Sequence, residues 1–402
     1  MGNRRVVGAV GPLVVLEEEF RKRLARLGYC GESVDRHGRL LREVSRWLVD
    51  RGCGVDGFVP VEFVADRARV GLSRALTVRS LNPLIEFLVV RGLMQQPVEP
   101  QAAEDCAAGV LLERFGRFLR VERGLGNGTV AGYLGAVGPF VMSRRSGDGL
   151  DLAGITADDV FAFLTEVCPG RSRGAAGVTA TAMRSLLGWL FLTGGIDRPL
   201  AEVVPRVGSW KLAGLVEPVA AADLTRMLAT CDQTTNAGRR DYAMLLVLSR
   251  LGLRAGEVAR LGLDDVDWRA GELIVRGKGP KDSRLPLPGD VGEAIADYLR
   301  HGRPDTAQGR TVFIRVQAPH REITKGGVTQ AVFAAGQRAG CGTVYAHRLR
   351  HTAATRMLAA GGSLFEIGEV LRHQRPVTTA IYAKVDLVRL RTIVRPWPSV
   401  TS

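Results

Sequence analysis

The chain has 402 residues, of which 46% are hydrophobic, and it carries a formal net charge of +14. Its length fits two or three globular domains. Such an excess of positive charge argues against a small-molecule enzyme and is typical of proteins that bind a polyanion, because each neutralised phosphate releases a counterion. An arginine-rich protein from a GC-rich genome would show the same excess, so charge alone leaves both interpretations open.

The cysteines and the N-terminal stretch argue against further classes. Six cysteines are scattered along the chain without a C-x-x-C pair, which argues against a zinc site and a disulfide framework and favours a reducing cytoplasm. The apolar run Val6–Leu16 leads into three glutamates without a small-residue cleavage site. It is also too short to span a bilayer. We therefore expect a cytoplasmic protein with no membrane partner.

Residues 16–200 are predicted to be helical throughout, in two halves that resemble each other. Ser33-Val34 and Thr129-Val130, which lie 96 residues apart, each begin an amphipathic pattern with a hydroxyl residue that can cap a helix. We interpret the halves as two copies of one small helical domain. The alternative is that any two amphipathic helical bundles share such spacing.

Polar stretches that contain proline separate the predicted domains. The expected order is an N-terminal helical domain at 1–95, a linker at 96–106, a second helical domain at 107–200, a linker at 201–217, a catalytic domain at 218–395 and a tail at 396–402.

After Pro218 the pattern becomes mixed. Short β signals occur at 265–268, 272–276 and 283–287, and the last two flank the sequence G-K-G-P-K, which is typical of a hairpin turn. Helices are expected at 221–230, 239–251, 255–261, 291–300, 324–339, 347–360 and 364–371. The predicted fold class is therefore mainly α with a small antiparallel sheet.

Two arginines in this region are suited to holding a phosphate. Arg254 precedes a predicted helix, whose N-terminus also favours anions. Arg350 ends the sequence H-R-L-R, which begins at His347. Each guanidinium can donate two hydrogen bonds in a fork that lysine cannot reproduce. With donors from His347 and His373, they would stabilise charge on a pentacovalent phosphorus without a metal ion or another cofactor.

Tyr382 is the candidate nucleophile for such a centre. A free phenol with a pKa near 10 attacks poorly at neutral pH, and neighbouring positive charge lowers that barrier. Lys278, at the tip of the predicted hairpin, can give a proton to the leaving oxygen as general acid. Lys281 and Arg284 share this hairpin and could hold phosphates instead.

Two neighbours of these residues receive structural roles. Glu257 follows Arg254 by three residues, and we expect it to orient that arginine or to pack locally. His351 follows Arg350 directly, so on a helix it points about 100° away from it, which favours a structural role.

In this order the residues resemble the tyrosine recombinase (phage integrase-like) family, nearest to its Xer-type and transposon-borne branches. The resemblance covers 218–395 well, and 107–200 resembles the family's helical, SAM-like core-binding domain. The family's catalytic set is an arginine, a lysine, H-x-x-R, a histidine or tryptophan, and a tyrosine. It is matched here by Arg254, Lys278, His347, Arg350, His373 and Tyr382.

The resemblance implies helical DNA-binding arms, a catalytic domain and a defined reaction. One strand of double-stranded DNA is cut, leaving a 3′-phosphotyrosine and a free 5′-hydroxyl, and a partner strand is joined without metal or ATP. A homo-tetramer at synapsis is implied, with accessory DNA-bending proteins as further partners.

The rivals are a type IB topoisomerase, which shares the chemistry, and a catalytically idle DNA-binding protein. Phage integration, transposition and chromosome-dimer resolution stay open as roles. The extra N-terminal domain favours a mobile element. An amphipathic segment at 386–394 could pack on its own domain or on a neighbouring protomer.

Overall fold

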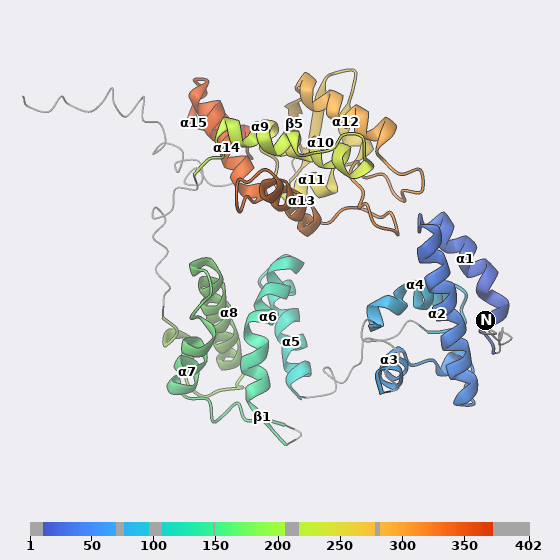
Figure 1. Ribbon diagram of the computed structural model, residues 1–402. Helices are drawn as coiled ribbons and strands as arrows, with labels where there is room; N and C mark the ends of the chain where they lie inside the picture. The colour runs from blue at the N-terminus through green and yellow to red at the C-terminus, as the bar shows by residue number, and fades with distance from the viewer. Residues whose placement is uncertain are drawn as a thin grey trace, which may run out of the picture. The chain divides into compact units, whose positions relative to one another are not determined.

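The computed structural model describes residues 11–69, 76–95, 107–147, 149–205, 217–277 and 282–372. The predicted fold class is confirmed: the chain is mainly helical, with small antiparallel sheets (Figure 1). It divides into two compact units, one formed by 1–95 together with 214–402, and the other by 96–213.

The N-terminal part is a four-helix module with its own core. Apolar side chains at helical spacing on each helix, among them Phe20, Leu41, Phe63 and Phe87, form one buried cluster. Its elements are η1 (Val14–Leu16), α1 (Glu17–Arg26), α2 (Gly31–Asp50), η2 (Val55–Gly57), α3 (Pro60–Arg69) and α4 (Val78–Val90).

The second unit is also a four-helix module. Thr156 caps one of its helices by accepting a hydrogen bond from the backbone N–H of Asp159, and Ser172 caps the next. Its elements are α5 (Ala107–Val121), α6 (Asn127–Ser143), the pair β1 (Arg145–Ser146) and β2 (Gly149–Leu150), α7 (Ala157–Val167), α8 (Arg173–Leu192) and η4 (Leu200–Glu202). Val204 is buried in the same core, so the packed module extends past residue 200.

The last three helices of the two modules follow one another at nearly the same spacing. Helix α6 begins 96 residues after α2, α7 begins 97 residues after α3, and α8 begins 95 residues after α4. The Ser33 and Thr129 hydroxyls lie inside α2 and α6 rather than at their N-caps, which are Cys30 and Gly126. The expectation of hydroxyl caps at these two helices is therefore wrong by three residues.

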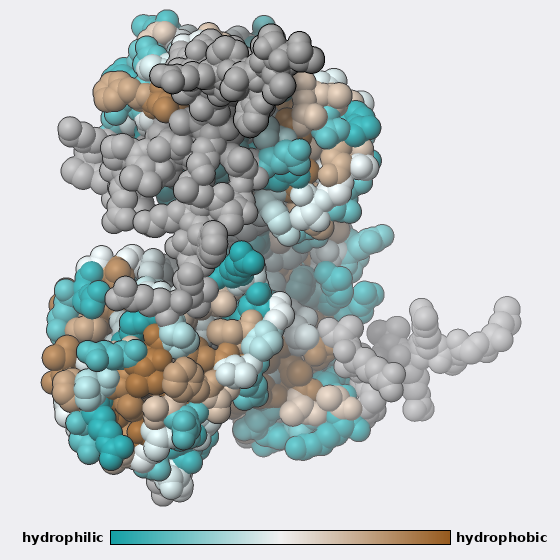
Figure 2. Space-filling model, turned by 90° about the vertical axis from the view of Figure 1, so that its left-hand side faces the viewer, coloured by the Kyte–Doolittle hydropathy of each residue, from teal (hydrophilic) through white to brown (hydrophobic). Residues whose placement is uncertain are grey.

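Among the described residues, α8 is the one helix long and apolar enough to cross a membrane by length and composition. Its Ala180, Met183, Leu186, Leu187 and Leu190 are buried in the core of the second module. We therefore interpret α8 as a core helix. Hydrophobic residues also gather on the visible face of this module (Figure 2).

The described part of the catalytic region is built around one buried helix, α10 (Asn236–Leu251). Its apolar run Met244–Leu248 is buried on all sides, because α12 (Gly289–His301) and α14 (Ala346–Ala359) pack against it (Figure 1). The other helices are α9 (Ala221–Ala229), α11 (Ala255–Arg260), η5 (Leu263–Asp265), α13 (Lys325–Arg338) and α15 (Leu364–Val370).

A three-stranded antiparallel sheet lies between α11 and α12 in the chain. Its strands are β3 (Val266–Asp267), β4 (Glu272–Arg276) and β5 (Asp282–Pro286), in the order β3-β4-β5. Leu273 pairs with Leu285, and both face the core, as the alternation of β4 and β5 requires. The predicted hairpin is confirmed, and its tip at 278–281 lies outside the described residues.

Candidate active site

Of the candidate residues that the structure describes, Arg350 is the most deeply buried. It lies in the second turn of α14 and is 3% exposed. One guanidinium nitrogen, Nη1, donates to the carbonyl of Gly252 at 2.6 Å, and Nη2 donates to the carbonyl of Leu371. These bonds tie α14 to the end of α10 and to the end of α15, and they fix the plane of the guanidinium.

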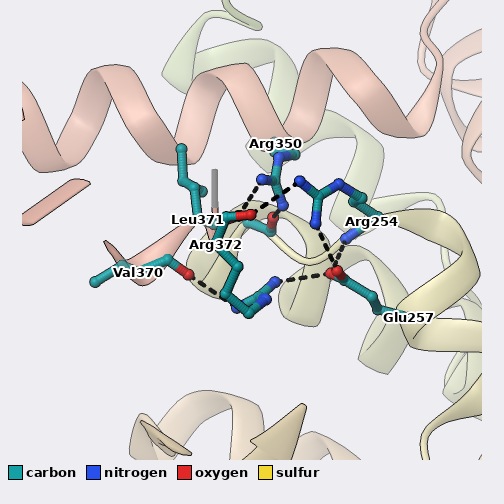
Figure 3. A network of polar contacts seen from close by, with 7 residues as sticks. Arg254, Glu257, Arg350, Val370, Leu371 and Arg372 are labelled. Carbon is teal, nitrogen blue, oxygen red and sulfur yellow. Dashed lines mark hydrogen bonds and ion pairs between the residues drawn. The ribbon is translucent and has the colours of Figure 1, made fainter. Parts of the chain in front are cut away.

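Arg254 is anchored beside it from another element. Its Nη1 donates to Glu257 Oε1 at 2.8 Å, and its Nη2 donates to the carbonyl of Arg372 at 3.3 Å (Figure 3). Its side chain is 47% exposed. Arg254 and Arg350 thus hold two consecutive carbonyls, those of residues 371 and 372, and Arg254 keeps a face open to a ligand.

Glu257 is the buried centre of this network. Its Oε2 accepts from the backbone N–H of Arg254 at 2.7 Å and from Arg372 Nη2 at 2.7 Å. Burial by itself raises the pKa of Glu257, but the hydrogen bond from the Arg254 backbone and the charge of Arg372 outweigh it and lower that pKa. A carboxylate at neutral pH is therefore held where it orients Arg254, one of the two roles expected from the sequence, and also Arg372.

Arg372 is a residue of the site that sequence reasoning missed. Its backbone has φ 56°, a left-handed conformation that is uncommon outside glycine. Its Nη1 donates to the carbonyl of Val370 at 2.8 Å, and its ion pair with Glu257 is almost fully buried. These contacts fix the backbone immediately before His373.

His347 and His351 form a pair on α14. Their Nε2 atoms lie 2.8 Å apart, and the rings meet edge to face at 4.3 Å between centroids. Partial burial, and then the charges of Arg350 and Arg254, lower the pKa of His347. Burial, followed by His347 and Arg350, lowers the pKa of His351 to about 4. Both imidazoles are therefore neutral at pH 7.

The shared proton between these histidines sets the role of His347. If the Nε2–H of His351 donates to Nε2 of His347, then His347 carries its own proton on Nδ1 and can donate it to a phosphate oxygen. If His347 donates, its Nδ1 has a lone pair and can accept a proton. His351 thus acts on the site through His347. The spacing of four residues, which places both on one helical face, was the signal in the sequence.

The pKa of His351 predicts acid sensitivity. Because its folded-state pKa lies below the unfolded value of 6.5, the unfolded state takes up the proton first as pH falls. The stabilisation is complete above pH 6.5 and is lost between pH 6.5 and about 4, on the order of 3 kcal/mol. We expect His351→Gln to show a smaller loss of unfolding free energy over this window than the wild type, measured by urea titration at several pH values.

The control for this experiment is His301→Gln, which changes an exposed histidine on α12. This variant should keep the wild-type pH dependence. Equal pH dependence in all three proteins would show that burial of His351 contributes nothing to acid sensitivity.

Gly252 is where backbone conformation supports the site. It ends α10 with φ 63°, and a Cβ there would lie 2.6 Å from Leu371 Cδ2. We expect Gly252→Ala to lower the unfolding free energy by about 2–4 kcal/mol, from left-handed strain plus overpacking against Leu371. Urea unfolding measures this loss.

Gly340→Ala is the matched control, since Gly340 has φ 67° but open space around its Cβ position. It should cost about 1–2 kcal/mol, the backbone strain alone. If the two variants lose the same stability, Leu371 makes room without cost and the steric part of the prediction is wrong.

The structure brings Arg254 and Arg350 together on the consecutive carbonyls of Arg372 and Leu371, and His347 lies on the same helix as Arg350. Lys278, His373 and Tyr382 lie outside the described residues, as does the segment at 386–394. The described chain nevertheless reaches the neighbours of two of them, Gly277 after β4 and Arg372 after α15. Within the described ranges, no group of three or more His, Cys, Asp or Glu side chains could hold a metal ion.

Comparison with known proteins places this site in a family. Residues 218–388 match the model described as "Phage integrase family". A protein of Sinorhizobium fredii (strain NBRC 101917 / NGR234) named as an integrase/recombinase, y4rA, is 38% identical to this chain over an alignment of 402 positions, gaps included. The alignment covers 96% of this chain and 95% of the relative. Tyrosine recombinase XerC of Oceanobacillus iheyensis is 29% identical over 286 residues, or 70% of this chain and 93% of XerC.

The fold agrees with these sequence matches. The crystal structure of the XerH site-specific recombinase, in a post-cleavage complex with its palindromic difH substrate, covers 72% of this chain and 96% of that one, with a TM-score of 0.54 and 17% identity. The XerC match leaves nearly a third of this chain uncovered, whereas the y4rA match covers almost all of it. On the sequence match over nearly its whole length, the chain belongs to the phage integrase family of tyrosine recombinases.

Proposed function

We propose that this protein is a site-specific DNA recombinase that cuts and rejoins strands through a covalent 3′-phosphotyrosine on Tyr382, without metal or ATP. The observation that carries the proposal is the pair of guanidiniums of Arg254 and Arg350. They are anchored to consecutive carbonyls just before His373, beside a neutral His347. Such a cluster of fixed donors suits the charge that develops on a phosphate under attack.

In the proposed reaction, the Tyr382 hydroxyl oxygen attacks the phosphorus and the bond from phosphorus to the 5′-oxygen breaks. The phenol proton passes to a neutral base, for which His347 has a free lone pair in one of its two tautomers. Lys278 gives a proton to the leaving 5′-oxygen. The tyrosyl phosphodiester keeps the bond energy, so a 5′-hydroxyl from a second duplex can reverse the step and join the strands.

The proposal extends to the arms and the partners. The matched order of helices in the two four-helix modules supports duplication of a DNA-binding arm. Double-stranded DNA is the proposed partner, with a homo-tetramer at synapsis, accessory DNA-bending proteins and a cytoplasmic location. A relative named as an integrase/recombinase matches nearly the whole of this chain, whereas XerC matches 70% of it. This difference favours a role for a mobile element.

The test is a nicked suicide duplex that carries the candidate site, incubated with the protein in a chelator and without ATP. We expect a covalent adduct on the 3′ side of the break with the wild type and none with Tyr382→Phe. Tyr345→Phe, which changes an exposed tyrosine just before α14, should form the adduct normally. Strand exchange between two labelled duplexes, as against plasmid relaxation, then separates a recombinase from a topoisomerase.

Two results would contradict the proposal. One is the absence of any adduct on DNA that flanks the protein's own locus. The other is an adduct that persists in Tyr382→Phe, which would assign the nucleophile to another residue.

A further inference from the structure

The N-terminal module has a basic hollow that the proposed reaction does not use. It lies between α2 and the start of α4 and has a volume of about 520 Å³. Its lining includes three exposed arginines, Arg36, Arg39 and Arg79. It is thus a concave surface with three guanidiniums at its edge.

The charge of this hollow is not neutralised by its own walls. Among its described lining residues, Glu43 is the acidic one, and Arg67 pairs with that carboxylate at 2.5 Å. Within the described ranges, Arg36 contacts the Ser33 hydroxyl at 3.5 Å, and neither Arg39 nor Arg79 has a carboxylate partner. The hollow therefore has a net excess of positive charge.

A buried histidine, His37, forms part of the wall of the hollow. His37 lines the hollow and is 8% exposed, and its Nδ1 has no hydrogen-bond partner among the described residues. The Tyr29 ring packs edge-on against it at 5.5 Å. An unsatisfied buried polar group costs about 1–3 kcal/mol and calls for an explanation. Since that nitrogen is itself closed off from solvent, a ligand in the hollow reaches it only if the wall moves.

The start of α4 adds a further favourable element. This helix has 13 residues, and Thr77 caps it together with Ser80, which lines the hollow. A helix N-terminus carries a partial positive charge and favours anions. Arg79 lies in the first turn, so its charge and the helix dipole act at the same place.

The fold of a four-helix module does not require these groups. At the positions 96 residues later, counted from the starts of α2 and α6, the second module has Gly132, Tyr133 and Gly135 in place of Arg36, His37 and Arg39. The second module packs its core without them. The basic residues are therefore suited to a ligand rather than to the packing of the helices.

We propose that this hollow binds a backbone phosphate of duplex DNA outside the cleavage site. The inference rests on the proposed function only in taking DNA as the source of the phosphate. Arginine forks can grip its non-bridging oxygens, and such contacts are independent of sequence. The N-terminal module thereby acts as an additional clamp on flanking DNA.

The test compares two charge-matched double variants of the full chain. Arg39→Gln/Arg79→Gln removes two charges from the hollow. Arg26→Gln/Arg46→Gln removes two from exposed positions on α1 and α2 that do not line it. Fluorescence anisotropy with a labelled duplex of arbitrary sequence, long enough to extend beyond the core site, gives affinity as a function of salt. We expect the slope of log affinity against log salt to be smaller by about two for the hollow variant and unchanged for the control.

Further measurements separate the alternatives. The hollow variant should form the covalent adduct on a short suicide duplex at the wild-type rate. If even the wild-type protein forms no adduct on this duplex, the result counts against the proposed function and not against the clamp. Thermal unfolding with inorganic phosphate tests a free anion as ligand. Equal salt slopes for both variants overturn the clamp, and so does a phosphate-dependent shift that requires the hollow while the duplex slope stays unchanged.

Discussion

Arg350→Lys is expected to lower the rate of covalent adduct formation by about 100- to 1000-fold, the range seen when one preorganised donor to a developing anion is removed. The charge stays, but lysine cannot bond both carbonyls that Arg350 holds, those of Gly252 and Leu371. The backbone before His373 would lose its anchor at the Leu371 carbonyl. Single-turnover cleavage of the suicide duplex measures the effect.

Arg348→Lys is the matched control, two residues earlier on the same helix. Arg348 also donates to two backbone carbonyls, those of Glu217 and Thr343, and within the described part of the chain its side chain has no bond to the site network. Its variant should cleave within about twofold of the wild type, as surface changes seldom matter. Thermal unfolding should show both variants folded. Equal cleavage by Arg350→Lys and the wild type would remove Arg350 from the reaction.

Glu257→Ala is expected to have the largest effect on stability. The substitution leaves the buried Arg372 guanidinium without its carboxylate partner. In the wild type, 9% of the Arg372 side chain and 4% of the Glu257 side chain are exposed. Breaking a buried pair by removing one partner costs about 3–5 kcal/mol. We also expect adduct formation to fall, because Arg254 loses two hydrogen bonds to the same carboxylate.

Urea unfolding and single-turnover cleavage at a temperature where the variant stays folded separate the two effects. Glu293→Ala, an exposed glutamate on α12, should stay within about 0.5 kcal/mol of the wild type. Glu257→Gln keeps one oxygen acceptor and should lie between wild type and alanine in both measurements. A Glu257→Ala protein with normal stability would show that Arg372 finds water or another partner at no cost.

The helical modules and the mixed region after Pro218 could be predicted because the patterns of helices and strands are local. Hydrophobic residues recur every 3.6 residues in a helix and every 2 in a strand, and this pattern depends only on nearby residues. It predicted the bounds of α9–α15 and β3–β5 to within a few residues. The first residue of a helix was predicted less accurately, since α2 and α6 begin at Gly31 and Asn127 rather than after the predicted hydroxyl caps. Several residues can offer a start, and packing of the apolar face selects one.

The sequence by itself pointed to the candidate residues of the site: Arg254, the pair His347 and Arg350 three residues apart, and Glu257, for which orienting Arg254 and local packing were both open. These are short motifs whose spacing within a helix or a turn is fixed by backbone geometry. The tertiary structure alone decided what each group touches. Arg350 reaches carbonyls 98 and 21 residues away, and Arg372 pairs with a glutamate 115 residues away. No local pattern encodes such contacts, because they exist only once α10, α11, α14 and α15 have packed together.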